Sequence, residues 1–378
     1  MNNLGEAPVT TFRLSALVAY LAALAAGCVT VPDARLCDVR DFGAKGDGQS
    51  SDSAAIQRAL DAAGAVEGTV YVPAGVYRCH DLKVPPRVTV KAEDQWTYDG
   101  ENHGATLQLD DPNARCLLDI TGATGVRLVG LQLTGIRETP KPVHGVLFDN
   151  PGKWSAQEDG VVLDGVKVQY FSGHGLYLNR IWVFAVRRSM FFRNGGCGLA
   201  LNGWDGFVSD SQFSDNGEHG FGVTGFGATV TFTANRVEWN RKAGLFVNGC
   251  DAWNVTGNCF DHNWGAGVEV RGLTASTFTG NVFRRCGREG GVQAILSGCT
   301  GIAFVGNACR AGQDDFGKGS FSPKTGLFLE KLENCVVKDN TLHDGYLATM
   351  IDDRGGHGPG MVIRDNVGRA MRPSVIIK

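Results

Sequence analysis

Short stretches of alternating apolar and polar residues recur along most of the chain at a nearly constant spacing. A glycine precedes the alternating residues of each stretch. The clearest copies, each with this glycine at its second position, are HGLYLN, CGLALN, HGFGVT, AGLFVN and AGVEVR. The spacings between their glycines are 23, 22, 24 and 23 residues, and fainter copies follow Gly145 and Gly326. Strict period-two alternation is typical of β-strands, and self-similarity at a fixed period is typical of stacked repeats. The repeat glycines are Gly175, Gly198, Gly220, Gly244 and Gly267.

Asparagines recur in phase with these strands and form two further series. Asparagine tolerates left-handed turns, and its side-chain amide can bond to the same residue on a neighbouring chain segment. The sequence therefore predicts ladders of stacked asparagines at the turns between strands. One series is Asn235, Asn258, Asn281, Asn307, Asn340 and Asn366, and the other is Asn194, Asn216, Asn240 and Asn263.

A repeat of this length holds two or three short strands and cannot bury its own apolar face. Successive repeats must therefore stack as coils, with parallel strands about 4.8 Å apart. We predict an all-β fold, a right-handed parallel β-helix with coils of about 23 residues, over residues 96–378. A propeller would need about 40 residues per blade, and leucine-rich repeats would need their own leucine and asparagine signature.

Residues 38–95 break this pattern and predict an N-terminal cap followed by the first coils. We expect a short helix from about Ser53, with Ser51 or Asp52 as its N-cap. The helix would cover the open end of the first coil, whose strand edges and core are otherwise exposed. Its buried face is predicted to consist of Ile56, Ala59, Leu60 and Ala63.

The same segment carries a family resemblance. DVRDFGAKGDGQSSDSAAIQRAL, from Asp38 to Leu60, followed by GTVYVPAGVYRC, resembles the opening of the pectate-lyase-like superfamily. Ser51 and Ser53 replace the usual Asp and Thr of that opening. The superfamily takes in polygalacturonase-related and rhamnogalacturonase-like proteins and phage tailspikes. The resemblance implies a β-helix that binds, and as an enzyme cleaves or modifies, a polysaccharide or oligosaccharide.

The first residues are typical of a targeting segment rather than of the fold. An apolar run from Leu14 to Gly27 ends in LAAGC, which resembles the bacterial lipoprotein signal, although Ala25 stands where leucine is usual. We therefore predict a signal peptide over residues 1–27, lipidation of Cys28 and a short linker over 28–37. The resemblance implies a bacterial envelope protein attached to a membrane through the lipid. The alternative is a plain secretory signal in which Cys28 is incidental.

Composition and charge limit the classes of partner and cofactor that we expect. A net charge of −3 provides no broad basic field, so nucleic acid is not an expected partner. No CxxC pair occurs among the eleven cysteines, and no acidic cluster indicates calcium, so we expect neither a metal site nor a cofactor. Leu273 occupies the same site on the coil between Cys250 and Cys299, so these two cysteines lie two strand spacings apart. That distance is too long for a disulfide, and both should be free thiols. Cys37 and Cys79 are a possible disulfide pair.

Candidate functional residues lie on the outward face of the first strand of each coil. The position four residues after each repeat glycine gives Asn248, Arg271 and Glu330, and Asp352 is assigned to the next coil. Glu330 and Asp352 would then lie about 5 Å apart at the backbone, a spacing that suits a carboxylate pair for glycoside hydrolysis. Arg271 could instead support proton abstraction from a uronate. We predict catalytic roles for these three residues and binding roles for Glu269, Tyr177, Phe246, Phe328 and Asn248.

A non-catalytic alternative remains open. The charged residues could be solvated surface ion pairs on a non-catalytic carbohydrate-binding or structural β-helix, because much of the outward column is Asn, Thr and Ser. A long loop, AGQDDFGKGSFSPK, precedes the strand that carries Glu330 and could form a wall of a cleft.

His174 lies in GHG, which in polygalacturonases surrounds an active-site histidine. Because the residue before the repeat glycine varies, we interpret His174 as part of the repeat.

Overall fold

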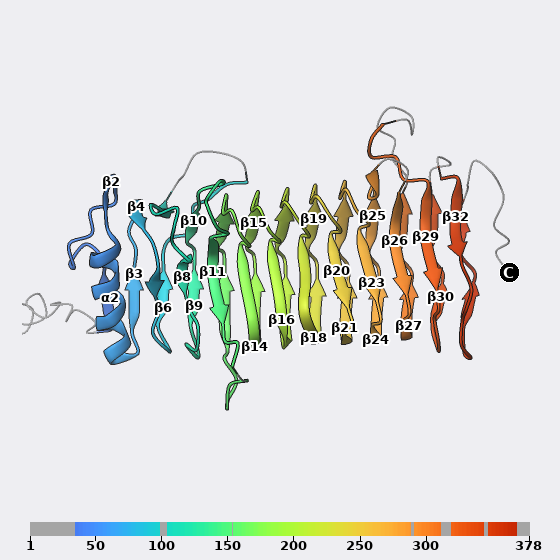
Figure 1. Cartoon of the computed structure of the whole chain (residues 1–378), viewed down its shortest axis with the longest axis horizontal. Helices are drawn as coiled ribbons and strands as arrows, with labels where there is room; N and C mark the ends of the chain where they lie inside the picture. Colours follow the sequence, from blue (N-terminus) through green and yellow to red (C-terminus); the bar gives the residue numbers. More distant parts are fainter. Residues whose placement is uncertain are drawn as a thin grey trace, which may run out of the picture.

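The computed structural model describes residues 35–98, 104–152, 154–288, 291–310, 319–343 and 347–368. These residues form one elongated parallel β-solenoid with a single helix at its N-terminal end (Figure 1). The predicted signal peptide, Cys28 and the loop residues Asp314, Asp315 and Lys318 lie outside the described residues. No helix within the described ranges is long and apolar enough to cross a membrane.

Each coil contributes strands to three columns, and every pairing between neighbouring coils is parallel. Columns 1 and 2 belong to one sheet of 21 strands, and column 3 is a second sheet of 13 strands. In three central coils a single long strand runs through columns 1 and 2 without interruption. These long strands are β14 (Leu176–Arg187), β16 (Leu199–Ser209) and β18 (Phe221–Thr233).

The remaining strands of columns 1 and 2 are short. Column 1 contains β5 (Leu82–Lys83), β8 (Cys116–Asp119), β11 (His144–Asp149), β20 (Leu245–Asn248), β23 (Val268–Arg271), β26 (Val292–Ser297), β29 (Thr325–Glu330) and β32 (Thr349–Asp353). Column 2 contains β1 (Leu36–Asp38), β3 (Thr69–Tyr71), β6 (Thr89–Lys91), β9 (Arg127–Val129), β12 (Val161–Asp164), β21 (Asp251–Thr256), β24 (Thr274–Thr279), β27 (Thr300–Val305), β30 (Val336–Lys338) and β33 (Val362–Arg364).

Column 3 follows column 2 in each coil after a tight turn. Its strands are β2 (Asp47–Ser51), β4 (Gly75–Cys79), β7 (Ala105–Leu109), β10 (Gln132–Thr134), β13 (Lys167–Gln169), β15 (Met190–Phe192), β17 (Gln212–Ser214), β19 (Arg236–Glu238), β22 (Cys259–Asp261), β25 (Val282–Arg284), β28 (Ala308–Arg310), β31 (Thr341–His343) and β34 (Val367–Gly368). Inward-facing residues of all three columns form one continuous apolar core.

The predicted cap is helix α2 (Ser53–Val66), which packs against β1, β3 and β5. The residues predicted for its buried face, with Ala55 in addition, are buried. Asp52 is the N-cap residue, but its side chain makes no capping hydrogen bond. Its buried carboxylate instead accepts the backbone N–H groups of Lys45 and Gly46, at 2.7 and 3.1 Å, and so fixes the DFGAKGDG turn against the helix.

The cysteine predictions had different outcomes. Cys250 and Cys299 are buried free thiols, as predicted. The predicted Cys37–Cys79 pair is wrong, because both thiols are free. Cys37 lies on β1 in column 2 and Cys79 lies on β4 in column 3, so the two residues belong to different sheets.

Both predicted asparagine ladders are present, and they join successive coils at the turns. The Asn258 side-chain oxygen accepts the backbone N–H of Asn235 at 2.9 Å and its amide N–H at 3.0 Å. The Asn258 amide donates to Asn281 on the next coil and to the carbonyl of Phe232. Ladder asparagines are almost fully buried, so these bonds satisfy polar groups that water cannot reach.

We predict that Asn258→Ala lowers the free energy of unfolding by about 2–3 kcal/mol. The substitution leaves the buried N–H of Asn235 and the carbonyl of Phe232 without partners, and each orphaned group costs about 1–3 kcal/mol. Chemical denaturation followed by circular dichroism measures the effect. Asn254→Ala, at an exposed site on β21, is the matched control and should change stability by less than about 0.5 kcal/mol. Equal effects at the two positions would contradict a structural role of the ladder.

Candidate functional site

The outward face of column 1 carries most of the predicted site residues in the predicted register. Asn248 pairs with Arg271, Arg271 with Ser297, and Ser297 with Glu330. Two residues earlier, Phe246 aligns with Glu269, and Ile295 aligns with Phe328. The strand alternation therefore predicted this face correctly up to β29.

The predicted pairing of Glu330 with Asp352 is wrong by two residues. Asp352 lies beside Phe328, and Leu327 lies beside Ile351. The stretch ATMIDD contains no glycine to mark the start of its strand, so a shift by two keeps the same face outward but moves the carboxylate to another row. Glu330 and Asp352 therefore do not form the predicted carboxylate pair in one row.

The three residues predicted to be catalytic each have a local partner. Arg271 forms an ion pair with Glu269 at 2.9 Å, and Glu330 accepts a hydrogen bond from Ser297 at 2.9 Å. Asp352 forms an ion pair with Arg354 at 2.8 Å. The three residues therefore make separate polar contacts along the face and do not converge on one point.

A denser cluster lies nearer the middle of column 1, where two histidines stand directly before repeat glycines. His144 and His174 begin adjacent coils, and their ring centroids are 5.2 Å apart. Tyr177, predicted to bind substrate, lies 5.1 Å from His144 and 5.4 Å from His174, with all three rings nearly parallel. Successive strands β11 and β14 bring the three rings together, because both histidines occupy the same place in the repeat.

Backbone groups of the following coil hold these histidine rings. Nδ1 of His144 accepts the backbone N–H of His174 at 3.0 Å, and Nδ1 of His174 accepts that of Cys197 at 2.9 Å. His219 accepts the N–H of Ala243 in the same way, at 3.1 Å. A neutral ring bonded at Nδ1 carries its proton on Nε2, which remains available as a donor. The recurring HG dipeptide was the sequence signal for this arrangement.

Burial keeps the same rings neutral. It lowers the pKa of His144 to about 4, with contributions from the neighbouring His174 and Arg115, and it lowers the pKa of His174. Burial followed by the charge of Lys242 lowers the pKa of His219 to about 4. At neutral pH the face therefore presents uncharged imidazole rings.

A cation and an amide row complete the cluster. Arg115 on the preceding coil forms an ion pair with Asp149, and Asn179 donates to the other oxygen of that carboxylate at 2.7 Å. Asn202 donates in turn to Asn179 at 2.8 Å. Burial and, next, the charge of Asp149 raise the pKa of the Tyr177 hydroxyl, while Arg115 lowers it. We call Arg115, His144, Asp149, His174 and Tyr177 the histidine–tyrosine site.

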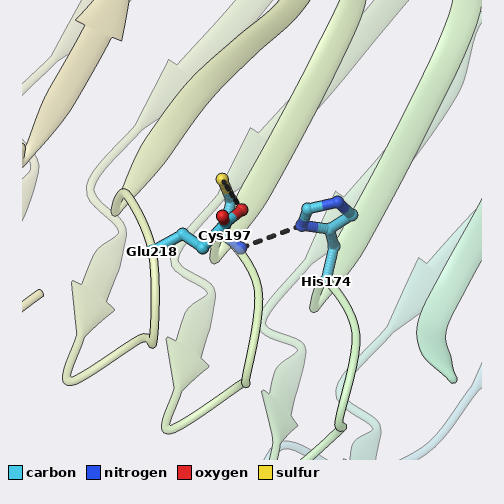
Figure 2. Close-up of side chains that lie close together, drawn as sticks. All are labelled: His174, Cys197 and Glu218. Carbon is cyan, nitrogen blue, oxygen red and sulfur yellow. Dashed lines mark hydrogen bonds between the residues drawn. The ribbon is translucent and has the colours of Figure 1, made fainter. Parts of the chain in front are cut away.

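Next to this site, His174, Cys197 and Glu218 come close enough together to resemble a metal centre (Figure 2). One ligand atom from each lies within 4.8 Å of the others. Internal contacts already involve these groups: Nδ1 of His174 accepts the Cys197 N–H, and the thiol contacts Glu218 at 3.6 Å. Glu218 also accepts from Lys242 at 2.7 Å, and burial raises the pKa of the thiol to about 12. The thiol therefore stays protonated, and the three side chains already have partners within the protein, which favours a structural role.

The profile described as "Right handed beta helix region" matches residues 144–283 and, in an overlapping alignment, residues 174–371. The second alignment alone covers more than half of the chain. The chain belongs to the right-handed β-helix family. Residues 36–83 match a second profile, described as "Rhamnogalacturonase A/epimerase, pectate lyase-like", which confirms the resemblance found in the opening segment.

Curated relatives from Azotobacter vinelandii include a mannuronan C5-epimerase and a lyase. AlgE2, a mannuronan C5-epimerase, is 31% identical over 232 residues, which cover 56% of this chain and 22% of that protein. Alginate lyase 7 is 29% identical over 198 residues, covering 49% and 23%. The matched part of the chain thus spans less than a quarter of these two relatives. The A-module of the epimerase AlgE4 has the same fold, with a TM-score of 0.58, 20% identity and coverage of 88% of this chain and 96% of the module.

We predict that the protein becomes less stable as the pH falls from about 6.5 to about 4. His144 and His219 have folded pKa values of about 4, below the ordinary value of 6.5. Within this window the unfolded chain binds protons that the folded chain does not, so acid favours unfolding. Thermal unfolding at closely spaced pH values measures the trend. His219→Gln, which cannot be protonated, should reduce the slope relative to the unmodified chain, whereas an unchanged slope would show that His219 makes no contribution.

Proposed function

We propose that this protein acts on an acidic, uronate-containing polysaccharide by removing the proton from the carbon that bears the carboxylate, as an epimerase or a lyase. The observation that carries the proposal is the histidine–tyrosine site, in which three nearly parallel rings adjoin the Arg115–Asp149 pair. Similarity to mannuronan C5-epimerases and an alginate lyase supports the same chemistry.

The reaction requires three kinds of group, and the site offers candidates for each. A cation must offset the substrate carboxylate, so that negative charge can build up as the proton leaves. The half-exposed guanidinium of Arg115 occupies a suitable position next to Asp149. One group must then take the proton, and another must donate one to the intermediate or to the departing sugar oxygen.

Tyr177 is the group best suited to exchange the proton. Both cluster histidines accept a backbone N–H at Nδ1, so their Nε2 atoms carry hydrogen and act as donors rather than as bases. Within the described part of the chain, the Tyr177 hydroxyl makes no hydrogen bond. Its phenolate would accept the substrate proton, and Nε2–H of His144 or His174 would stabilise the resulting negative charge.

The two possible outcomes share this first step. Return of a proton to the opposite side of the same carbon inverts it and gives the epimer. In the other outcome, the electron pair left by the proton forms a double bond to the neighbouring carbon. The glycosidic oxygen on that carbon leaves with the electrons of the broken C–O bond and takes up a proton, so the chain breaks and an unsaturated sugar remains. Either outcome is favoured over hydrolysis by Glu330 and Asp352, because each of those carboxylates already has a local partner, Ser297 for Glu330 and Arg354 for Asp352.

We predict that Tyr177→Phe reduces turnover of mannuronan by at least about 10²-fold, the usual contribution of a positioned acid or base. NMR of the polymer detects epimerisation, and ultraviolet absorbance detects unsaturated ends. Burial raises the pKa of Tyr177, so its phenolate is scarce at neutral pH. In the unmodified protein the rate should therefore rise roughly tenfold per pH unit as the pH increases from neutral toward that pKa.

Tyr71→Phe on β3 is the matched control and should retain full activity. Activity of Tyr177→Phe within a factor of about two of the unmodified protein would assign the proton transfer to another group. Absence of any turnover by the unmodified protein on mannuronan and other uronate polymers would contradict the proposed function as a whole.

We also propose that the protein is exported and attached to the bacterial envelope through lipidated Cys28, on the basis of the LAAGC motif. When the chain is expressed in a bacterial host, labelled fatty acid should be incorporated and the protein should sediment with membranes. Cys28→Ser should abolish labelling. Unlabelled Cys28 in the unmodified protein would contradict lipidation.

A further inference from the structure

A second group of polar and aromatic side chains lies at the end of column 3, across the turn from the histidine–tyrosine site. At the residue that follows each of five successive strands, β13, β15, β17, β19 and β22, the backbone adopts a left-handed conformation. The φ angles lie between 51° and 62° at Tyr170, Arg193, Asp215, Trp239 and His262. Bulky residues rarely adopt this conformation, and glycine would relieve the strain. Strained positions that retain large polar or aromatic side chains point to a role for those side chains.

A cavity of about 230 Å³ lies over this row. Its lining comes from consecutive coils and from one segment that crosses them. The lining residues are Tyr98, Phe192, Arg193, Ser214, Asp215 and Trp239.

The segment that ends at Tyr98 is fixed in place by buried contacts. Lys167 is almost fully buried, and its ammonium donates to the carbonyls of Thr97 and Tyr98, at 2.8 and 3.2 Å. The Tyr98 hydroxyl is 3.1 Å from both Ser214 and the buried carboxylate of Glu238. A charged residue in the interior needs such partners, so the contacts hold this wall in one position.

The aromatic side of the cavity resembles a stacking platform. Tyr98 and Phe192 lie 5.6 Å apart, and Trp239 is 39% exposed although it is a large aromatic residue. The Trp239 ring is stacked on His262 with ring centroids 3.9 Å apart, and the Phe321 ring is nearly perpendicular to it with centroids 5.3 Å apart. Such support leaves one aromatic surface rigid and accessible to the flat face of a sugar ring.

The polar side of the cavity belongs to a network of ion pairs. Asp215 pairs with Arg193 at 3.0 Å and faces Arg241 at 4.0 Å, and Glu238 pairs with Arg236 at 2.7 Å. On the next coil, Asp261 lies 3.2 Å from Arg284 and 3.4 Å from Arg285. Of these guanidinium groups, that of Arg193 lines the cavity. A guanidinium group that lines a cavity matches the geometry of a carboxylate on a ligand.

We propose that this cavity is a second binding site for acidic polysaccharide, separate from the site of reaction. One pyranose ring stacks on Trp239, a hydroxyl of that ring binds Asp215, and a carboxylate of the polysaccharide approaches Arg193. The choice of a uronate polymer rests on the proposed function, whereas the cavity, its exposed Trp239 and its Arg193 do not. A second contact with the same polymer raises the effective concentration of substrate beside the solenoid.

The test is calorimetric titration with hexameric oligomannuronate in the Tyr177→Phe background, where turnover does not disturb the measurement. Trp239→Ala should remove one bound hexasaccharide per chain, and Arg193→Gln should weaken binding at the same site at least about tenfold. Phe207→Ala, at an aromatic residue on column 2 that is even more exposed (57%) than Trp239, is the control and should leave binding unchanged. Thermal unfolding verifies that each variant is folded.

The outcomes separate this inference from the proposed function. Equal stoichiometry and affinity with and without Trp239 would overturn the second site, whatever the turnover assay shows. Loss of one bound hexasaccharide would support it even if the unmodified protein shows no turnover. Equally tight binding of neutral maltohexaose, or binding that is insensitive to salt, would overturn the assignment to an acidic ligand.

Discussion

Hydrogen bonds between identical positions on successive coils are the constraint on which the rest of this structure depends. A single coil has no core of its own, so each strand is stable only when the next coil repeats its geometry. The buried asparagines enforce that repetition, since each amide must meet its counterpart one coil away. A slip of even one residue would turn apolar side chains outward and leave buried amides without partners.

The same constraint decides which side chains meet on the surface. Residues that share a position in the repeat lie side by side, even when they are far apart in sequence. His144 and His174 stack for this reason, and Asp149, Asn179 and Asn202 form a hydrogen-bonded row. A change at one place in the repeat therefore alters the environment of the neighbouring coils, so a site can be assembled from single residues on several coils.

The fold and the face of column 1 could be predicted from sequence because glycine spacing and period-two alternation report directly on stacking. The register remained predictable through Glu330, where a glycine marks the strand, and was lost at Asp352, where none does. The histidine–tyrosine site was missed for a different reason. The position before the glycine varies, and only the backbone shows that His144, His174 and His219 accept N–H groups there. The row of Arg193, Asp215 and Trp239 was not predicted, because the sequence does not show the left-handed backbone at these positions.

The asparagine ladders also give the solenoid a direction. Each side-chain amide in the longer ladder, from Asn235 to Asn340, donates its N–H to the asparagine of the following coil. The amide dipoles consequently point the same way and add along the axis, with the positive ends toward the C-terminus, much as peptide dipoles add in an α-helix. The two ends of the solenoid are thus electrically inequivalent. A polysaccharide chain also has two different ends, so the two directions in which it can lie along the axis differ in energy.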